Sequence, residues 1–305
     1  ISQRPLSIRW DQSRDEYLYS IHECKKAIAD GVSYEVCLTN QLRMPLKLAG
    51  LDLYRILRKT NPAPFAAYLK HHDFEIVSAS PERFLSVDNG GMVEAKPIKG
   101  TSLRDVDPKR DQELAAALQQ SEKDRAENLM IVDLMRNDIG RVAVRGSVTV
   151  PRLMYIESYA TVHQLLSTVR AKLRPECGLV DLLRAAFPGG SITGAPKVRT
   201  MQIIDHLERS ARGVYCGSIG YLGYNRVADL NIAIRTISVD KEGLSLGAGG
   251  AITQLSDAND EFAEIVLKAQ ALVRAISLYV HGREVDYLGQ FLNPLESATA
   301  EAGVA

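Results

Sequence analysis

The sequence predicts a mixed α/β fold, with one domain over residues 1–280 and a tail over residues 281–305. Helix-type and strand-type patterns are interspersed along the whole chain, and no internal repeat is evident. No proline- and serine-rich break interrupts residues 10–280, so nothing there indicates a linker between domains. Of the 305 residues, 46% are hydrophobic and 24% charged, which is enough to bury a sizeable core. Residues 293–305 have the composition of a linker or a disordered segment.

The first predicted elements are a helix, a strand and a hairpin. Residues 13–31 start with a serine cap, place apolar side chains at helical spacing and end at Gly31, which predicts an amphipathic helix. Residues 33–44 are rich in strand-forming side chains, so they predict a strand. Residues 82–95 predict a hairpin, because an Asn-Gly-Gly sequence separates its two apolar halves.

The remaining elements follow from the same two periodicities. We expect one long helix with a very polar start over 107–142, strands within 146–173, a glycine-rich loop running into a helix over 188–208, three successive strands within 213–252 and a final helix over 257–276. Helical and strand signals therefore continue to the end of the predicted domain.

Composition excludes several classes of function. Lysine plus arginine equals aspartate plus glutamate at 37 each, so no net field attracts nucleic acid or an anionic membrane, and a small molecule or a protein is the expected partner. No apolar stretch is long enough for a membrane span, and no basic-then-apolar leader is present. The four cysteines are scattered, which favours a reducing cytoplasm over disulfides or a zinc site. Because the chain begins at Ile1, we expect it to be part of a longer polypeptide.

Two predicted helices each carry a pair of carboxylates at the border of an apolar face. Asp124 and Glu127 are three residues apart on the first, and Glu261 and Glu264 are three apart on the second. Partly buried carboxylates need a positive partner, so this arrangement suits a hard cation. The same spacing also fits two solvated helix faces, with Glu264 and Lys268 forming an ordinary surface pair.

Two glycine clusters offer backbone amides where side chains do not block approach. Residues 187–197 lead into a helix and could bind an anion there, although they match neither the Walker loop nor the GxGxxG pattern. Residues 247–250 form the second cluster, and Arg235 closes a strand, where it could clamp a carboxylate. The alternative interpretation of both glycine clusters is a tight turn, and that of Arg235 is a structural ion pair.

Three further side chains could take part in chemistry. His163 lies on a predicted strand and could act as an acid, a base or a hydrogen-bond donor, or be purely structural. Glu82 follows a proline at the start of the hairpin and could instead be a salt-bridged rim residue. Lys99 stands between Ile98 and Gly100, where partly apolar surroundings would lower the pKa of its amine from about 10.4 and make it nucleophilic. The alternative is a surface lysine after a turn.

Taken together, these motifs resemble the chorismate-utilising enzymes: anthranilate synthase component I, aminodeoxychorismate synthase component I, isochorismate synthase and salicylate synthase. The resemblance runs from about residue 14 to 276, with the motifs in the family's order and at its spacing. The motifs are SASPERF (78–84), PIKGT (97–101), RAENLMIVDLMRND (125–138), GGSITGAPK (189–197), IAIRT (232–236) and GAGGAITQLSDANDEFAEIVLKA (247–269). The resemblance implies two packed antiparallel sheets with helices outside and a site in the cleft between them.

The resemblance also implies a role for each candidate residue. Mg²⁺ would be held by the residues matching Glu127 and Glu264, with Asp124 and Glu261 as neighbours that act through water, and it would grip the ring carboxylate of chorismate. Six residues would bind the substrate: Tyr215, Arg235, Gly249, Gly250, Thr101 and Thr193. Among these, Tyr215 and Arg235 would hold the enolpyruvyl carboxylate, helped by amides near Gly249.

The implied catalytic residues are Lys99, Glu82 and His163. Glu82 matches the acid that protonates the departing C4 hydroxyl, and His163 matches the histidine near that hydroxyl. The Lys99 amine would attack C2 of chorismate as the hydroxyl leaves, and ammonia would then enter at C4 and expel the lysine. This route yields 4-amino-4-deoxychorismate, on the way to p-aminobenzoate and folate, with ammonia from a glutamine amidotransferase subunit or domain.

Two positions favour this reaction over those of other family members. Isochorismate and salicylate synthases carry a water-activating lysine where this chain has Glu35, so water addition is disfavoured. Glu35 also departs from the glutamine usual in amino-transferring members. The PIKGT motif with Lys99 and the GGSITGAPK motif resemble aminodeoxychorismate synthase, whereas anthranilate synthases usually read PIAGT. Anthranilate synthase component I remains the alternative enzyme, and an inactive docking or binding remnant the alternative from another class.

Overall fold

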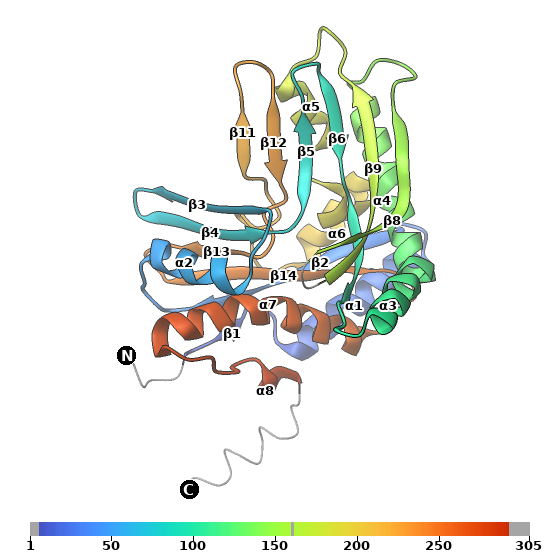
Figure 1. Cartoon of the computed structure of the whole chain (residues 1–305). Coiled ribbons are helices and arrows are strands. Elements are labelled where there is room, and N and C mark those ends of the chain that lie inside the picture. Colours follow the sequence, from blue (N-terminus) through green and yellow to red (C-terminus); the bar gives the residue numbers. More distant parts are fainter. Residues whose placement is uncertain (1–5, 160–161, 293–305) are drawn as a thin grey trace, which may run out of the picture.

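The protein is described by a computed structural model over residues 6–159 and 162–292, which form two antiparallel sheets covered by helices (Figure 1). The first sheet has the order β1 (Arg9–Trp10), β2 (Glu35–Met44), β14 (Leu244–Ile252), β13 (Thr236–Val239), β4 (Phe74–Ser80) and β3 (Phe65–His71), and β10 (Gly194–Ala195) also pairs with β2. The second has the order β11 (Gly220–Leu222), β12 (Ala228–Asn231), β5 (Arg83–Val87), β6 (Met92–Ala95), β9 (Val162–Lys172) and β7 (Ile98–Leu103), and β8 (Thr149–Ser158) pairs with β9. The predicted α/β fold with two antiparallel sheets is confirmed.

Helices flank each sheet. They are α1 (Arg14–Ala29), α2 (Gly50–Thr60), α3 (Pro108–Gln120), α4 (Glu122–Gly140), α5 (Leu179–Ala186), α6 (Lys197–Leu207), α7 (Ala258–His281) and α8 (Gly289–Leu292), with a short 3₁₀ helix over Gly190–Ile192. Helix α7 packs on β14 with α1 and α2 beside it, whereas α4 packs on β9 with α5 beside it. The two carboxylate-bearing helices therefore belong to different sheets.

Local sequence signals explain several boundaries. The Ser13 hydroxyl accepts a hydrogen bond from the Glu16 amide, and the Glu16 carboxylate accepts one from the Ser13 amide, so a capping box starts α1 where the sequence predicts a helix. The predicted hairpin is also confirmed as β5 and β6, and Gly91 adopts a positive φ of 75° in its turn. These elements depend only on neighbouring residues.

The long helix predicted over 107–142 is wrong, because Ser121 divides it into α3 and α4. Ser121 has an extended ψ of 114°, and its hydroxyl accepts a hydrogen bond from the Asp124 amide at 3.3 Å. One serine thus ends α3 and caps α4. The break changes the direction of the chain just before the acidic pair of α4.

The prediction of three strands within 213–252 is also wrong, because the structure has four strands there. The hairpin of β11 and β12 joins the second sheet, whereas β13 and β14 join the first. The chain crosses between sheets at Arg235, which has a positive φ of 51°. Periodicity alone gave no sign of this crossing.

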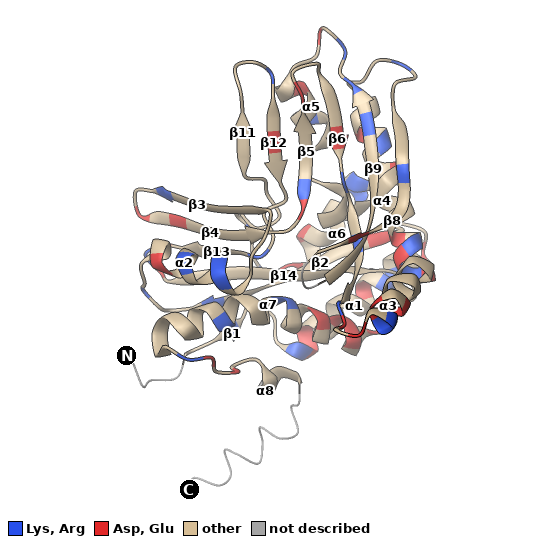
Figure 2. Ribbon diagram, viewed as in Figure 1, with Lys and Arg blue, Asp and Glu red and all other residues tan. Residues whose placement is uncertain are grey.

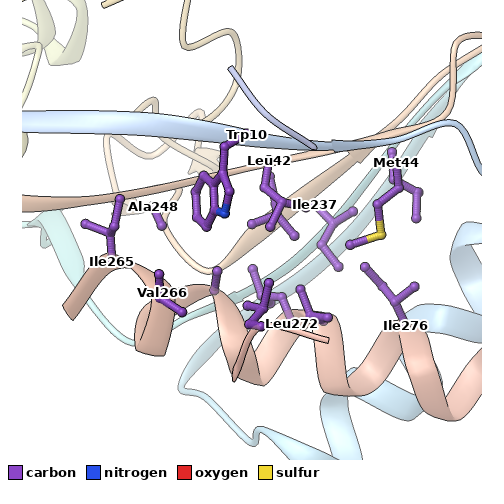
Figure 3. Packing of buried hydrophobic residues seen from close by; sticks show 14 of the residues in the cluster. Trp10, Leu42, Met44, Ile237, Ala248, Ile265, Val266, Leu272 and Ile276 are labelled. Atoms are coloured by element: carbon purple, nitrogen blue, oxygen red, sulfur yellow. The ribbon is translucent and has the colours of Figure 1, made fainter. Parts of the chain in front are cut away.

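Each sheet has its own hydrophobic core. Figure 3 shows Ile265, Leu272 and Ile276 of α7 directed toward Leu42 and Ile237 of the first sheet, and all five are almost fully buried. A second cluster lies between the second sheet and α4, including Leu85, Val93, Ile131, Met135 and Val169. Side chains that lie between the two sheets are thus free to be polar without interrupting either core.

The packed structure extends beyond the predicted domain boundary at residue 280. Leu288 is buried in the first core, and Ser277 donates a hydrogen bond to the carbonyl of Arg283. Residues 293–305, for which a linker or disorder is predicted, lie outside the described residues. All four cysteines have free thiols. Within the described ranges, no helix is long and apolar enough to cross a membrane.

Candidate active site

Lys99 lies between the two sheets and pairs with two carboxylates. Its Nζ is 2.5 Å from Oε1 of Glu35 on β2 and 3.8 Å from Oε2 of Glu127 on α4. Only 8% of the Lys99 side chain and none of the Glu35 side chain is exposed. The register of β7 shifts after Ile98, and Gly100 has a positive φ of 86°, so a bulge directs the lysine into the site.

The charge state of Lys99 differs from the sequence-based expectation. Burial alone would lower the pKa of its amine, as predicted, but the charges of Glu35 and Glu127 and the hydrogen bond to Glu35 outweigh burial and raise this pKa. Lys99 is therefore an ammonium in this structure, and the predicted lowering of its pKa is wrong. The sequence could not reveal the cause, because Glu35 is 64 residues away along the chain.

Glu82 lies within the electrostatic influence of Lys99 and is almost completely buried. Burial raises the pKa of its carboxyl from 4.5 to about 7, although a hydrogen bond from Ser191, the charge of Lys99 and the Ile98 amide act in the opposite direction. A carboxylic acid that keeps its proton near neutral pH is suited to protonate a leaving group. The structure thus brings two of the three predicted catalytic residues together.

The four predicted metal-binding residues lie at the N-terminal parts of α4 and α7. Glu127 is buried, its Oε1 has no hydrogen-bond partner, and burial raises the pKa of its carboxyl to about 7. Glu261 is buried and bound by Lys123 and Ser256, whereas Glu264 is bound by Lys268 at 2.5 Å. Basic and acidic residues are both frequent along the ribbon where α3 and the N-terminal end of α7 lie (Figure 2).

The oxygen donors are of the type that binds a divalent cation, although lysines pair with three of the four carboxylates here. Within the described ranges, no three His, Cys, Asp or Glu side chains form a ready-made metal centre. Glu127 pairs with Lys99 through Oε2, but its buried Oε1 has no hydrogen-bond partner and is free to bind a cation; oxygen donors are the ligands that Mg²⁺ prefers. Gly250 leaves room for Glu261, since a Cβ there would lie 2.9 Å from the Glu261 Oε2. Asp124 lies beside Gly100, the residue that follows Lys99.

Tyr215 and Arg235 form an apolar and cationic corner of the site. The Tyr215 ring lies against Gly247, where any β-carbon would overlap it. The Arg235 guanidinium is buried, which lowers its pKa, and one of its nitrogens donates to the carbonyl of Lys268 at 2.8 Å. Among the described residues, no carboxylate lies within 4.0 Å of this guanidinium. Arg235 is therefore available to bind an anion, and the structural ion pair considered above is not formed.

The two site glycines of β14 differ in where their amides point. The Thr39 amide opposite Gly249 donates to Glu208 rather than to β14. In an antiparallel pair, two directly opposed residues either hydrogen-bond to each other through both backbone groups or both point those groups outward. The amide and the carbonyl of Gly249 therefore also point away from β2. Its carbonyl accepts a hydrogen bond from Lys268 at 2.9 Å, in agreement with that orientation. The amide of Gly249, and not that of Gly250, therefore lies on the side away from β2.

Three predicted site residues have other partners. His163 is buried, and its two ring nitrogens bond to Ser158 at 2.7 Å and to Asp111 at 3.0 Å, which places it in a network with α3. The Thr193 hydroxyl donates to the carbonyl of Gly189, and Thr101 is exposed on β7. Among the described residues, no hydrogen bond or ion pair joins these three to Lys99. Their predicted roles stay predictions.

Sequence analysis missed Lys123 and Ser191. Lys123 binds Glu261 from a helix 138 residues earlier in the chain, and Ser191 bonds to Glu82 from the glycine-rich loop. Both are common polar residues without a motif of their own. Their proximity to predicted site residues is the signal that identifies them, and it exists only in three dimensions.

Gly194 fixes the strand that carries Glu35. It has a φ of +125°, and a β-carbon there would overlap the backbone carbonyl of Glu35. We expect Gly194→Ala to lower the free energy of unfolding by about 3 kcal/mol, from overlap and backbone strain together. Gly213→Ala is the control, because Gly213 also has a positive φ but no atom lies within 4 Å, so about 1 kcal/mol is expected. Urea denaturation measures both, and equal losses would contradict the overlap.

Comparison with known proteins places this geometry in a family. A model of the chorismate binding enzyme family matches residues 2–274. Aminodeoxychorismate synthase of Streptomyces pristinaespiralis is 51% identical over 271 residues, which are 89% of this chain and 38% of that protein. Aminodeoxychorismate synthase component 1 of Escherichia coli K12 is 44% identical over 266 residues, or 87% of this chain and 58% of that protein. The chain thus spans well under two thirds of the length of these relatives.

Solved structures show the same fold. Anthranilate synthase component I from Streptococcus pneumoniae TIGR4 superposes with a TM-score of 0.81 at 35% identity, covering 90% of this chain and 61% of that one. A putative isochorismate synthase from Bacillus anthracis superposes with a TM-score of 0.78 at 22% identity, covering 91% and 76% of the two chains. With the same two sheets, and with its own carboxylates, guanidinium and buried lysine among them, the chain belongs to the family of chorismate binding enzymes.

Proposed function

We propose that this chain catalyses the amination of chorismate at C4, which gives 4-amino-4-deoxychorismate and water from chorismate and ammonia. One observation carries the proposal: the buried amine of Lys99 lies 2.5 Å from Glu35 and within the influence of Glu82. A nucleophile, a proton acceptor and a proton donor are thus close to one another. The names of the relatives, which are aminodeoxychorismate synthases, support the same reaction.

Because Lys99 is an ammonium, it must lose a proton before it can attack C2 of chorismate. Glu35 is the acceptor within reach, and its Oε2 has no hydrogen-bond partner, so it can take that proton. The carbon–nitrogen bond at C2 then forms while the double bond shifts and the C4–oxygen bond breaks. Glu35 therefore supplies the basic group that burial of Lys99 alone does not provide.

Glu82 would donate its proton to the departing C4 oxygen, which leaves as water. Ammonia then attacks C4, the double bonds shift back, and the bond between C2 and Lys99 breaks. The freed amine of Lys99 takes back the proton held by Glu35, which restores the ion pair. The extra proton of the incoming ammonia goes to the Glu82 carboxylate, which restores the acid. A pKa of about 7 suits a group that both gives and takes a proton near neutral pH.

The two carboxylates of chorismate need cationic partners. Arg235 and the Gly249 amide would bind the enolpyruvyl carboxylate beside the Tyr215 ring. Glu127 and Glu264 would hold Mg²⁺, with Asp124 and Glu261 near it. When bound, the ion would supply positive charge for the ring carboxylate.

Ammonia would come from glutamine through an amidotransferase, which makes the overall reaction an amino-group transfer. The relatives named component 1 support the need for a second component. The product would serve p-aminobenzoate and folate synthesis, and the four free thiols agree with a reducing compartment such as the cytoplasm.

The test is to incubate the chain with chorismate, Mg²⁺ and an ammonium salt at mildly alkaline pH and to identify the product by mass spectrometry. We expect 4-amino-4-deoxychorismate, which a coupling lyase converts to p-aminobenzoate. Formation of anthranilate would assign the chain to the alternative synthase. Binding of chorismate without turnover, also in the presence of an added amidotransferase, would support the inactive remnant and reject the proposal.

A further inference from the structure

Lys123 links the two halves of the site through a single ion pair. It lies in the first turn of α4, and its Nζ is 3.0 Å from Oε1 of Glu261 on α7. Helix α4 packs on the second sheet and α7 on the first, so the pair joins helices that belong to different sheets (Figure 1). The Lys123 side chain is 42% exposed, whereas that of Glu261 is 3% exposed.

The surroundings of Lys123 are strongly acidic. Burial alone would lower the pKa of its amine, but Glu261, Glu127 and Glu264 together raise it. Ser256 donates a second hydrogen bond to the same oxygen of Glu261 that binds Lys123. Three carboxylates from two helices thus act on this ammonium group, while Glu127 and Glu264 also pair with Lys99 and Lys268.

These three carboxylates are among those assigned to the divalent cation under the proposed function. A divalent ion between Glu127 and Glu264 would place two positive charges beside the ammonium of Lys123. Like charges at such separations repel by several kcal/mol where solvent is largely excluded. Glu127 still has an unpartnered buried oxygen in the presence of Lys123, so the lysine neutralises this cluster only in part.

We propose that Lys123 is a tethered competitor of the divalent cation, which holds Glu261 in the metal-free protein and leaves it when the cation binds. This inference rests on the metal site of the proposed function. Lys123 would then be a positioning residue. It would set the cation concentration at which the metal site fills, and it would hold α4 and α7 together before the cation binds.

The first test measures Mg²⁺ binding by titration calorimetry without chorismate. Lys123→Met keeps the length of the side chain and removes its charge, so we expect Mg²⁺ affinity to rise roughly three- to tenfold, as is typical when a partly exposed ion pair is removed. Lys25→Met is the matched control. Lys25 also contacts the loop before α7, where it donates a hydrogen bond to the carbonyl of Ser256. It forms no ion pair with a carboxylate of the described residues, so its replacement should change Mg²⁺ affinity less than twofold.

The second test measures the displacement itself. Limited acetylation of lysines, mapped by peptide mass spectrometry, should modify Lys123 several-fold faster when Mg²⁺ is present, with Lys25 unchanged. In the Glu261→Gln variant, Lys123 should be acetylated without any metal as fast as it is in the wild-type chain with Mg²⁺, because the carboxylate that restrains the amine is gone. The acetylation rate reports the position of the amine and does not depend on turnover.

The outcomes separate this inference from the proposed function. If Mg²⁺ binds but Lys123→Met does not tighten binding, or if Mg²⁺ leaves the acetylation of Lys123 unchanged, the competition is wrong while the metal site stands. If neither the wild-type chain nor the variant binds Mg²⁺, the metal site fails and this inference fails with it. Synthesis of 4-amino-4-deoxychorismate is scored independently of both.

Discussion

Replacement of Lys99 by alanine is expected to reduce formation of 4-amino-4-deoxychorismate by about a thousandfold or more, because the proposed route has no other nucleophile at C2. The amine of Lys99 is buried and lies 2.5 Å from Glu35, so alanine at this position leaves Glu35 without its partner and chorismate without an amine. Product formation from chorismate and ammonium, followed by mass spectrometry, measures the loss. Wild-type protein given chorismate without ammonium should also gain the mass of chorismate less one water, and Lys99→Ala should not.

Loss of stability has to be separated from loss of the nucleophile. Lys99→Ala leaves Glu35 buried without its partner, which typically costs about 3–5 kcal/mol. The double variant Lys99→Met and Glu35→Gln avoids that unpaired charge and should fold better while staying inactive. Lys197→Ala is the control for lost stability, since Lys197 is a mostly buried lysine paired with Asp138 at 2.5 Å, and its turnover should fall far less than that of Lys99→Ala. Unchanged product formation in Lys99→Ala would refute the covalent route.

The second large effect is expected at Glu82. Glu82→Gln should lower activity by about 10²–10⁴-fold, as is usual when a general acid is removed. The same variant should gain stability at alkaline pH. The pKa of Glu82 is about 7 in the folded protein against 4.5 as the reference, so the wild-type chain loses stability as pH rises from 4.5 to about 7. A glutamine does not titrate and escapes this loss.

The expected size of the effect follows from that difference in pKa. It corresponds to about 3 kcal/mol of unfolding free energy. Above pH ~7, Glu82→Gln should be more stable than wild type by this full amount, and below pH ~4.5 the gain should be absent. Urea denaturation at several pH values measures it. Glu94→Gln is the control, because Glu94 pairs with Arg83 and Arg170 and its replacement should not stabilise the protein at high pH. A pH-independent difference between Glu82→Gln and wild type would show that Glu82 is ionised in the folded chain.

Local sequence signals predicted the elements whose boundaries depend on their own residues. The helix after Ser13 and the hairpin at Asn89 were predictable because caps and turns are made within a few residues. The break at Ser121 was missed, since the same residue types suit both a continuous helix and a double cap. The crossing at Arg235 was missed because it depends on which sheet each strand joins.

The sequence by itself determined the mixed fold, the residues from which the site is built and, through its motifs, the family. Side-chain type and spacing carry that information, as in the acidic pairs of α4 and α7 and the lysine of PIKGT. Only the tertiary structure decided how those residues are charged and paired. The pKa of Lys99 is raised rather than lowered, because Glu35 and Glu127 approach it from another sheet and a helix. Electrostatic energies depend on distance and burial in space, and neither quantity is contained in separation along the chain.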